Sequence, residues 1–203
     1  MNSGVTAERV YDALKRRLLS GDLLPGERLE PARFAAELTS SVTPVRDALN
    51  RLEGERLVET RASEGFHLPL VAEPMLRDLY QWNAALLRLV ARSWRSGPHV
   101  ARANALPVDL GRAVPAFFAL FAARSDNREH EAQVAAASDR LATARVAEAA
   151  TLDALEDELR ALAVAFDQDT LAGLLRLVDR YHRRRLTAAP RILRALYDPR
   201  PRQ

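Results

Sequence analysis

The chain has 203 residues and contains no cysteine. Without thiols it cannot form disulfide bonds, thiolate zinc sites or a cysteine nucleophile. Long apolar runs are also absent, since no segment approaches the roughly 18 uncharged apolar residues of a membrane span. The polar start Met1-Asn2-Ser3-Gly4 lacks the apolar core of a signal peptide. These absences predict a soluble, cytoplasmic protein that does not enter a membrane.

Sequence signatures of the common enzyme classes are missing as well. The chain has no glycine-rich phosphate-binding loop and no nucleophile elbow. Glu156, Asp157 and Glu158 form an acidic run, but consecutive residues on a helix diverge by about 100° and cannot converge on one substrate atom. We therefore predict that the protein is not an enzyme and that it uses no cofactor.

Histidine is scarce, and its copies are scattered as His67, His99, His130 and His182. None lies three or four residues from another, whereas a metal site needs several ligands that converge. The run around His130 is typical of an exposed helix face, and His182 stands among arginines, which makes it a poor cation ligand. We expect no bound metal.

The most informative stretch that is present runs from Thr43 to Leu49. Thr43 can cap a helix, and Pro44 fits the first helical position, where no N–H is needed. Apolar residues then recur with helical spacing and predict one buried face, formed by Val45, Ala48, Leu49 and Leu52. The opposite face offers Arg46, Asp47, Asn50 and Arg51. A helix with Arg and Asn on its outer face suits the major groove of DNA.

The flanking segments complete a recognisable supersecondary unit. Residues 31–38 read as a helix that a short break at Thr39-Ser40-Ser41 separates from the next one. Residues 10–19 form an earlier amphipathic helix, which ends in a turn at 21–26. Strand-like runs at 57–61 and 66–70 flank the loop 62–65, in which Gly65 can take a positive φ. Three helices followed by a hairpin predict a winged helix-turn-helix.

Several of these pieces resemble, in order and spacing, the amino-terminal domain of GntR-family bacterial transcription regulators. They are Leu24-Pro25-Gly26-Glu27-Arg28-Leu29, Phe34-Ala35-Ala36-Glu37-Leu38, Ser41-Val42-Thr43-Pro44-Val45-Arg46-Asp47-Ala48-Leu49, Leu57-Val58 and Gly65. The resemblance covers roughly residues 5 to 71. It implies a homodimeric repressor or activator that binds double-stranded DNA at a palindromic operator.

The resemblance also implies which residues touch DNA. The turn and the start of the recognition helix correspond to Ser41, Thr43 and Arg46, and the wing tip that reaches the minor groove corresponds to Gly65 and His67. The chain departs from the family pattern at Val42, where an arginine is usual, and at Arg33, one step displaced from the usual position at Ala32. With the other outward polar residues, the expected DNA-binding set is Arg33, Ser41, Thr43, Arg46, Asn50, Arg51, Gly65 and His67.

Residues 73–203 have only helical patterns and predict an antiparallel bundle. The expected helices span 74–94, 108–124, 127–150, 152–166 and 171–186, and a last short helix follows Pro190 and ends near Tyr197. Pro115 should kink the second of these helices or mark its first turn. The expected fold is thus mainly α, with a winged helix-turn-helix domain at 1–72 and a helical effector-binding and dimerisation domain at 73–203.

The bundle loosely resembles the FadR-type branch of the same family, as Asp78-Leu79-Tyr80 illustrates. The resemblance implies a small-molecule effector. In metal-binding members an Asp and three His hold a cation, but Leu155 and Leu159 occupy the first of these places here. Without a metal, an effector should be apolar, and we name Trp82, Asn83, Phe117 and Phe121 as candidate pocket residues. Plain core is the favoured interpretation of the aromatic side chains, and a pocket lining is the alternative.

Charge is distributed unevenly along the chain. Residues 1–72 hold 10 Lys/Arg and 11 Asp/Glu (net −1), residues 73–175 hold 11 and 14 (net −3), and residues 176–203 hold 9 and 2 (net +7). DNA binding by the first domain must therefore rely on local arginines and helix dipoles. The basic carboxyl-terminal run fits a solvated helix face, an oligomer rim or a phosphate contact. A winged helix or bundle that serves protein–protein interaction alone remains the alternative.

Overall fold

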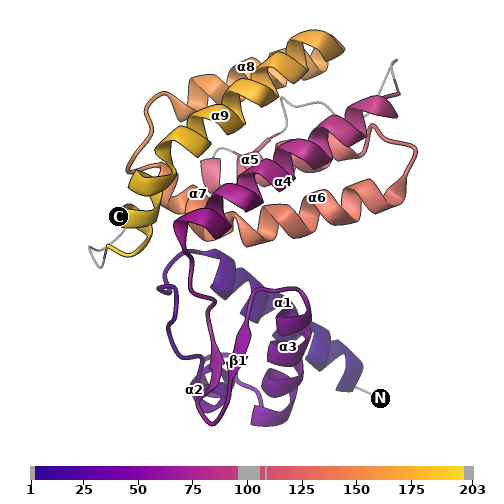
Figure 1. Ribbon diagram of the computed structural model, residues 1–203. Helices are drawn as coiled ribbons and strands as arrows, with labels where there is room; N and C mark the ends of the chain where they lie inside the picture. Colours follow the sequence, from indigo (N-terminus) through magenta and orange to yellow (C-terminus); the bar gives the residue numbers. More distant parts are fainter. Residues whose placement is uncertain (1–2, 96–105, 108, 199–203) are drawn as a thin grey trace. The chain divides into compact units, whose positions relative to one another are not determined.

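The computed structural model describes residues 3–95, 106–107 and 109–198, which divide into two compact units (Figure 1). The first unit contains the described residues up to Val71 together with those from Leu196 onward. The second unit runs from Ala72 to Ala195. None of the described helices is long and apolar enough to cross a membrane.

The first unit is a winged helix, as the sequence predicts. Its helices are α1 (Ser3–Leu19), α2 (Pro31–Glu37) and α3 (Val42–Gly54), and its strands are β1 (Glu59–Arg61) and β2 (Gly65–His67). The strands pair antiparallel, with Thr60 opposite Phe66. Both are shorter than predicted. Leu57 does not belong to a strand because its N–H bonds back to the carbonyl of Leu52, at 3.0 Å, and closes the end of α3.

The start of α3 differs from the prediction by about two residues. Ser41, not Thr43, is the N-cap, and its side chain makes no capping bond. Pro44 is therefore the third helical residue. This position costs no hydrogen bond, since the first four N–H groups of a helix have no partner within it.

The predicted buried face of α3 is confirmed. Val45, Leu49 and Leu52 are fully buried, and Ala48 is 4% exposed. They pack with apolar residues from α1, α2 and the segments around the wing: Val10, Leu14, Leu18, Leu23, Leu29, Phe34 and Leu68. This core fixes which side of α3 remains outside.

The second unit is a helical bundle. Its elements are α4 (Glu73–Arg92), α5 (Leu110–Ala122), α6 (Arg128–Arg140), α7 (Ala142–Glu148), α8 (Leu155–Asp167) and α9 (Leu171–Leu196). Helices α4 and α9 run antiparallel, because Arg88 pairs with Asp179, Asn83 with His182 and Arg77 with the carbonyl of Leu186. Pro115 lies inside α5 and does not mark its first turn.

Two helix boundaries in the bundle were predicted wrongly. The segment 127–150 is two helices, since Arg145 donates to the backbone carbonyl of Ser138 at 2.7 Å and the chain turns at Leu141. Helix α9 continues through Pro190 without a break. Proline has no N–H for the carbonyl four residues earlier. That carbonyl belongs to Leu186, and the guanidinium of Arg77 donates to it at 2.6 Å. The carbonyl therefore has a hydrogen-bond donor even though the backbone N–H is missing.

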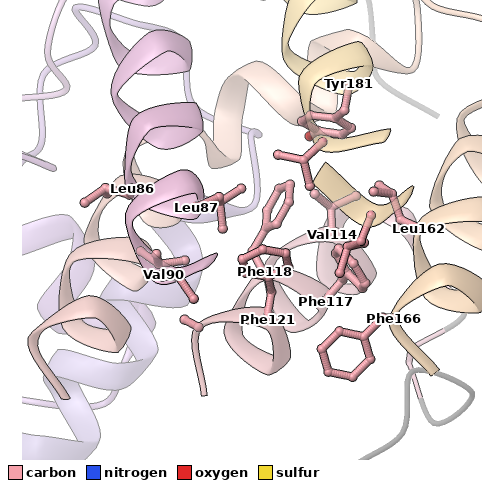
Figure 2. Close-up of a cluster of buried hydrophobic side chains, with 14 of the residues drawn as sticks. Leu86, Leu87, Val90, Val114, Phe117, Phe118, Phe121, Leu162, Phe166 and Tyr181 are labelled. Carbon is pink, nitrogen blue, oxygen red and sulfur yellow. The ribbon is translucent and has the colours of Figure 1, made fainter. Parts of the chain in front are cut away.

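An apolar core joins the bundle helices (Figure 2). Phe117, Phe118 and Phe121 of α5 are fully buried and meet Leu87 and Val90 of α4. Helices α8 and α9 add Leu162, Phe166, Leu174, Val178 and Tyr181. The rings of Phe117 and Phe166 pack edge to face with centroids 5.9 Å apart, as aromatic side chains prefer.

Candidate nucleic-acid interface

The turn between α2 and α3 holds the start of α3 in place. Thr39 has a φ of 50°, and the N–H of Ser40 reaches back to the carbonyl of Ala35 at 2.9 Å. This pattern closes the end of α2 in the way that usually requires glycine. A β-branched residue in that conformation is strained. The strain lies directly beside Ser41 and the first turn of α3.

The first two turns of α3 present an exposed polar face. Ser41, Thr43, Arg46 and Asn50 are all exposed, on the side away from the buried stripe. Arg46 forms no ion pair or hydrogen bond with any other described residue, so its guanidinium is free to bind a phosphate or the edge of a guanine. The free N–H groups at the start of α3 add a partial positive charge.

The other two predicted arginines are engaged within the unit. Arg33 bonds to Glu37 at 2.9 Å and lies 3.7 Å from Glu27. Arg51 bonds to Glu8 at 2.9 Å, and its guanidinium carbon lies 3.6 Å from the centre of the Tyr11 ring. Arg51 therefore joins α3 to α1 in this structure.

The two residues that the resemblance placed at the wing tip, Gly65 and His67, differ in exposure. Gly65 is exposed beside the turn with a φ of 83°, and nothing lies within 4 Å of where a Cβ would stand. His67, by contrast, is buried, and its Nδ1 lies 3.1 Å from the carbonyl of Gly65. His67 is the last residue of β2 and pairs with both Glu59 and Arg28, so its side chain faces the protein interior. The exposed tip is formed by residues 62–65.

Most basic side chains of this unit meet a carboxylate. Lys15 bonds to Glu55 at 2.8 Å, and Arg61 to Glu59 at 2.7 Å. Burial alone would raise the pKa of Glu55, but hydrogen bonds from Lys15 and Tyr11 hold it below its ordinary value. These pairs remove basic charge from the surface and make the free guanidinium of Arg46 the distinctive feature of the face.

One basic residue near this face was missed in the sequence. Arg9 of α1 donates from its guanidinium to the carbonyl of Leu38 at 3.4 Å, next to the turn before α3. The two residues are 29 positions apart, and no local pattern links them. The contact follows only from the packing of α1 on the helix pair.

The structure does not bring the predicted effector residues together. Trp82 is 47% exposed on α4, which contradicts its expected place in the core or a pocket. Met75, Trp82 and Leu89 recur every seven residues along α4, and all three are exposed. Trp82 thus belongs to an exposed apolar row of α4 and not to its buried face. Phe117 and Phe121 lie in the apolar core, and Asn83 is fully buried beside His182.

A buried polar cluster occupies the interior between α4, α7, α8 and α9. Arg185 is 1% exposed, and it bonds to Glu148 at 2.9 Å and to Glu158 at 2.6 Å. Its guanidinium lies 3.3 Å from the centre of the Tyr181 ring. The hydroxyl of Tyr80 donates to Glu148 at 2.7 Å, and burial raises the pKa of Tyr80 well above its ordinary value. The acidic run is thus not wholly solvated, because Glu158 turns inward.

His182 and Asn83 extend this cluster. His182 is 2% exposed, with Nδ1 at 2.7 Å from the carbonyl of Val178 and Nε2 at 2.9 Å from the side-chain amide of Asn83. A neutral imidazole that donates from Nδ1 accepts at Nε2, so the amide N–H of Asn83 is the matching donor. Burial, together with the nearby cations Arg185, Arg145 and Arg88, lowers the pKa of His182 to about 4, although the hydrogen bond to the Val178 carbonyl acts in the opposite direction. The imidazole is therefore neutral at pH 7.

Each described histidine is buried and contributes to packing within its own unit. His130, expected on an exposed face, is 9% exposed, and its Nδ1 lies 2.7 Å from the hydroxyl of Ser125. His99 lies outside the described residues. Leu155 and Leu159 are half-buried, and Leu159 packs against the bundle core. Within the described ranges, no three His, Cys, Asp or Glu side chains gather as metal ligands would.

Comparison with known proteins gives a family for the first unit. Residues 6–68 match the family described as "Bacterial regulatory proteins, gntR family". The Nta operon transcriptional regulator of Aminobacter aminovorans is 41% identical over 68 residues, which are 34% of this chain and 32% of that protein. The HTH-type transcriptional regulator McbR of Escherichia coli is 35% identical over 71 residues, again 32% of its length. The chain thus matches about a third of each relative, and these relatives are regulators rather than enzymes.

Similarity in fold extends further than similarity in sequence. The solved structure of E. coli McbR/YncC has a TM-score of 0.71 at 18% identity and covers 91% of this chain and 97% of that one. A putative GntR regulator from Rhodococcus sp. RHA1 has a TM-score of 0.74 at 16% identity, with the same coverage. These two likenesses concern the fold alone. The match in sequence and the arrangement of α2, α3 and the wing agree, and residues 6–68 form a winged-helix domain of the gntR family of bacterial regulatory proteins.

Proposed function

We propose that the protein is a one-component bacterial transcription regulator that binds operator DNA in the cytoplasm. The observation that carries this proposal is the outer face of α3, where Ser41, Thr43, Arg46 and Asn50 are exposed in a gntR-family domain. A helix of this kind enters the major groove with the residues of its first turns directed at the bases. The exposed tip at Gly65 suits a wing that approaches the minor groove, since no side chain keeps the backbone away.

Replacing Arg46 tests this proposal directly. Arg46→Ala should weaken specific binding by about 1–3 kcal/mol, the cost of a good contact to a base edge, and leave the fold intact because the side chain is exposed. Binding to the DNA upstream of the protein's own gene is measured by fluorescence anisotropy at fixed salt.

The matched control is Arg56→Ala. Arg56 is also exposed and follows the other end of α3, so its loss should leave specific affinity nearly unchanged. If Arg46→Ala binds like the wild type, α3 does not read the operator in the proposed way. A wild-type protein without any salt-dependent DNA binding would favour the alternative of a pure protein-interaction module.

The proposal includes a homodimer on a palindromic operator, with the outer face of α4 as the contact. Met75, Trp82 and Leu89 are 55%, 47% and 42% exposed and recur every seven residues, the spacing of a coiled-coil seam. Asp78 and Arg92 stand on the same face without partners among the described residues. An antiparallel second α4, with Trp82 opposite Trp82, would bring Asp78 of each copy within about two helical turns of Arg92 of the other. Two winged helices would then face two half-sites.

The proposal also includes a small-molecule effector in the helical unit. The Nε of Arg145 is buried there without a partner among the described residues, and the buried hydroxyl of Tyr181 lies beside the same Arg145 side chain. Buried polar groups are normally hydrogen-bonded, and unpaired ones destabilise the fold. These atoms favour an effector with oxygen acceptors over the apolar one expected from the sequence. Such a ligand can regulate DNA binding if it prefers one of two dimer geometries.

A further inference from the structure

The outer face of α9 carries an unusual row of arginines. Five exposed arginines lie on it: Arg176, Arg180, Arg183, Arg191 and Arg194. At 100° per residue, their directions fall within a sector of about 80°. Buried residues of α9, among them Leu174, Val178 and Ile192, point the opposite way. We refer to the five residues as the α9 arginine face.

Among the described residues, no carboxylate pairs with this face. None of the five forms an ion pair with a described residue, and Asp179, the acidic residue of α9, pairs with Arg88 at 2.6 Å. The adjacent Arg184 and Arg185 turn aside toward Glu158. Like charges three or four residues apart destabilise a helix, so this arrangement opposes folding. No ion pair within the described chain offsets this repulsion. The first unit shows the contrary pattern, because most of its basic residues are paired.

The dimensions of the face match a nucleic-acid backbone. From Arg176 to Arg194 the helix rises about 27 Å, which equals about eight phosphate steps along one strand of B-form DNA. Arginine binds phosphate oxygens with two parallel N–H donors. Alternating charges, which are typical of a merely solvated helix face, do not occur here.

We propose that the α9 arginine face binds the phosphate backbone of duplex DNA outside the base pairs that the winged helix reads. This inference rests on the proposed function, since the winged helix holds DNA near the rest of the chain and so raises its effective concentration. The charge distribution supports it, because residues 1–72 have a net charge of −1 whereas residues 176–203 have +7. The second surface supplies the phosphate neutralisation that the first domain lacks.

The test compares two triple variants of the full chain with equal change in charge. One is Arg176→Gln, Arg180→Gln and Arg183→Gln on α9. The control is Arg56→Gln, Arg112→Gln and Arg128→Gln, three exposed residues outside α9 that form no ion pair with a described residue. Fluorescence anisotropy measures binding to a random-sequence duplex of about 40 base pairs, from about 50 to about 200 mM KCl.

We expect the α9 variant to bind at least about tenfold more weakly at low salt and to lose about 0.9 of salt slope for each phosphate contact. The control should stay within about twofold of the wild type. The melting temperature of the α9 variant should be equal or higher, because repulsion along the helix is removed. A third variant with lysine at the same three positions keeps the charge and should restore most of the salt slope.

Each other outcome overturns the inference. Equal losses in both triple variants would mean that net charge alone matters. An α9 variant that binds DNA like the wild type would leave the face to an acidic protein partner. In both cases the proposed function survives, whereas a wild type that binds no duplex at any salt concentration would refute the proposed function itself.

Discussion

Arg183, Arg184 and Arg185 are consecutive in the sequence but meet three different environments. Arg183 is exposed, Arg184 is half-buried near Glu158, and Arg185 is enclosed between Glu148 and Glu158. Composition indicates only a basic run. The helical turn of about 100° per residue predicts that the three diverge, but not which one meets carboxylates from α7 and α8. Those partners lie 27 and 37 positions away, beyond any local pattern.

His182 should make stability depend on pH. Its folded-state pKa of about 4 lies below the ordinary value of 6.5, so the unfolded chain takes up the proton first as pH falls. The stabilisation is complete above about pH 6.5 and is lost between 6.5 and about 4, by up to about 3 kcal/mol. Urea unfolding at a series of pH values measures this loss.

His182→Gln provides the comparison, because glutamine does not titrate in this range. We expect the variant to be less stable than the wild type at pH 7.5, where it loses well-placed contacts to Val178 and Asn83. Between pH 6.5 and 4.5 its stability should fall less steeply. Parallel curves for the two proteins would show that the His182 proton is not linked to folding.

Single residues also show where local prediction ends. The spacing of Val45, Ala48, Leu49 and Leu52 predicts the buried face of α3. This prediction succeeds because the periodicity within a single helix is enough to define its apolar face. His67, which the resemblance places at the wing tip, and His130, which was predicted on an exposed helix face, are both buried. Their environments depend on pairing with Arg28 and on Ser125, respectively, which hydropathy does not encode.

At the scale of elements, helices were easier to predict than their ends. The apolar periodicity of α4, α5 and α8 appears in the sequence, and the helices are found within a few residues of the expected places. The break at Leu141 and the continuity of α9 were missed for one reason. In both cases an arginine side chain donates a hydrogen bond to a backbone carbonyl. Arg145 donates to Ser138, and Arg77 donates to Leu186, which lies 109 positions away.

Arg77 and Pro190 should therefore be energetically coupled. Arg77→Met leaves the Leu186 carbonyl without its donor, and we expect a loss of about 1–2 kcal/mol in the free energy of unfolding. Pro190→Ala supplies a backbone N–H at the position that can bond to this carbonyl. In the Pro190→Ala background, Arg77→Met should cost less than about 0.5 kcal/mol beyond that variant.

A double-mutant cycle from urea unfolding measures the coupling. A coupling energy of at least about 0.5 kcal/mol supports the interpretation that Arg77 replaces the missing backbone donor at the Leu186 carbonyl. Strictly additive effects would show that the helix at Pro190 is held by packing and not by Arg77.

At the scale of the molecule, the two units differ in how far sequence predicts them. The winged helix is encoded by short local motifs between Leu24 and Gly65, so its fold and its helix α3 could be predicted. The bundle has the expected class, but its interior polar cluster joins four helices and has no sequence motif. The face of α4 illustrates the gap, since Trp82 was assigned inward and lies outward.

Self-association should depend on this α4 face. We expect the wild type to sediment as a dimer at micromolar concentration, and Trp82→Ser with Leu89→Ser to sediment as a monomer because two exposed apolar contacts are lost. A cooperative melting transition of the monomeric variant would show that its fold is intact. Val164→Ser, at another exposed apolar residue, is the control and should stay dimeric.

Two results would contradict this prediction in different ways. A monomeric wild type would refute the homodimer. A dimeric Trp82→Ser, Leu89→Ser variant would place the contact on another surface.

The contact between Tyr197 and Val71 has a consequence for the order of events during synthesis. The Tyr197 hydroxyl lies 2.9 Å from the N–H and 3.0 Å from the carbonyl of Val71, which the ribosome delivers 126 residues earlier. Most of the winged helix can fold as soon as it emerges. Its last contacts wait until α9 has been translated, so the unit that begins to form first is completed last.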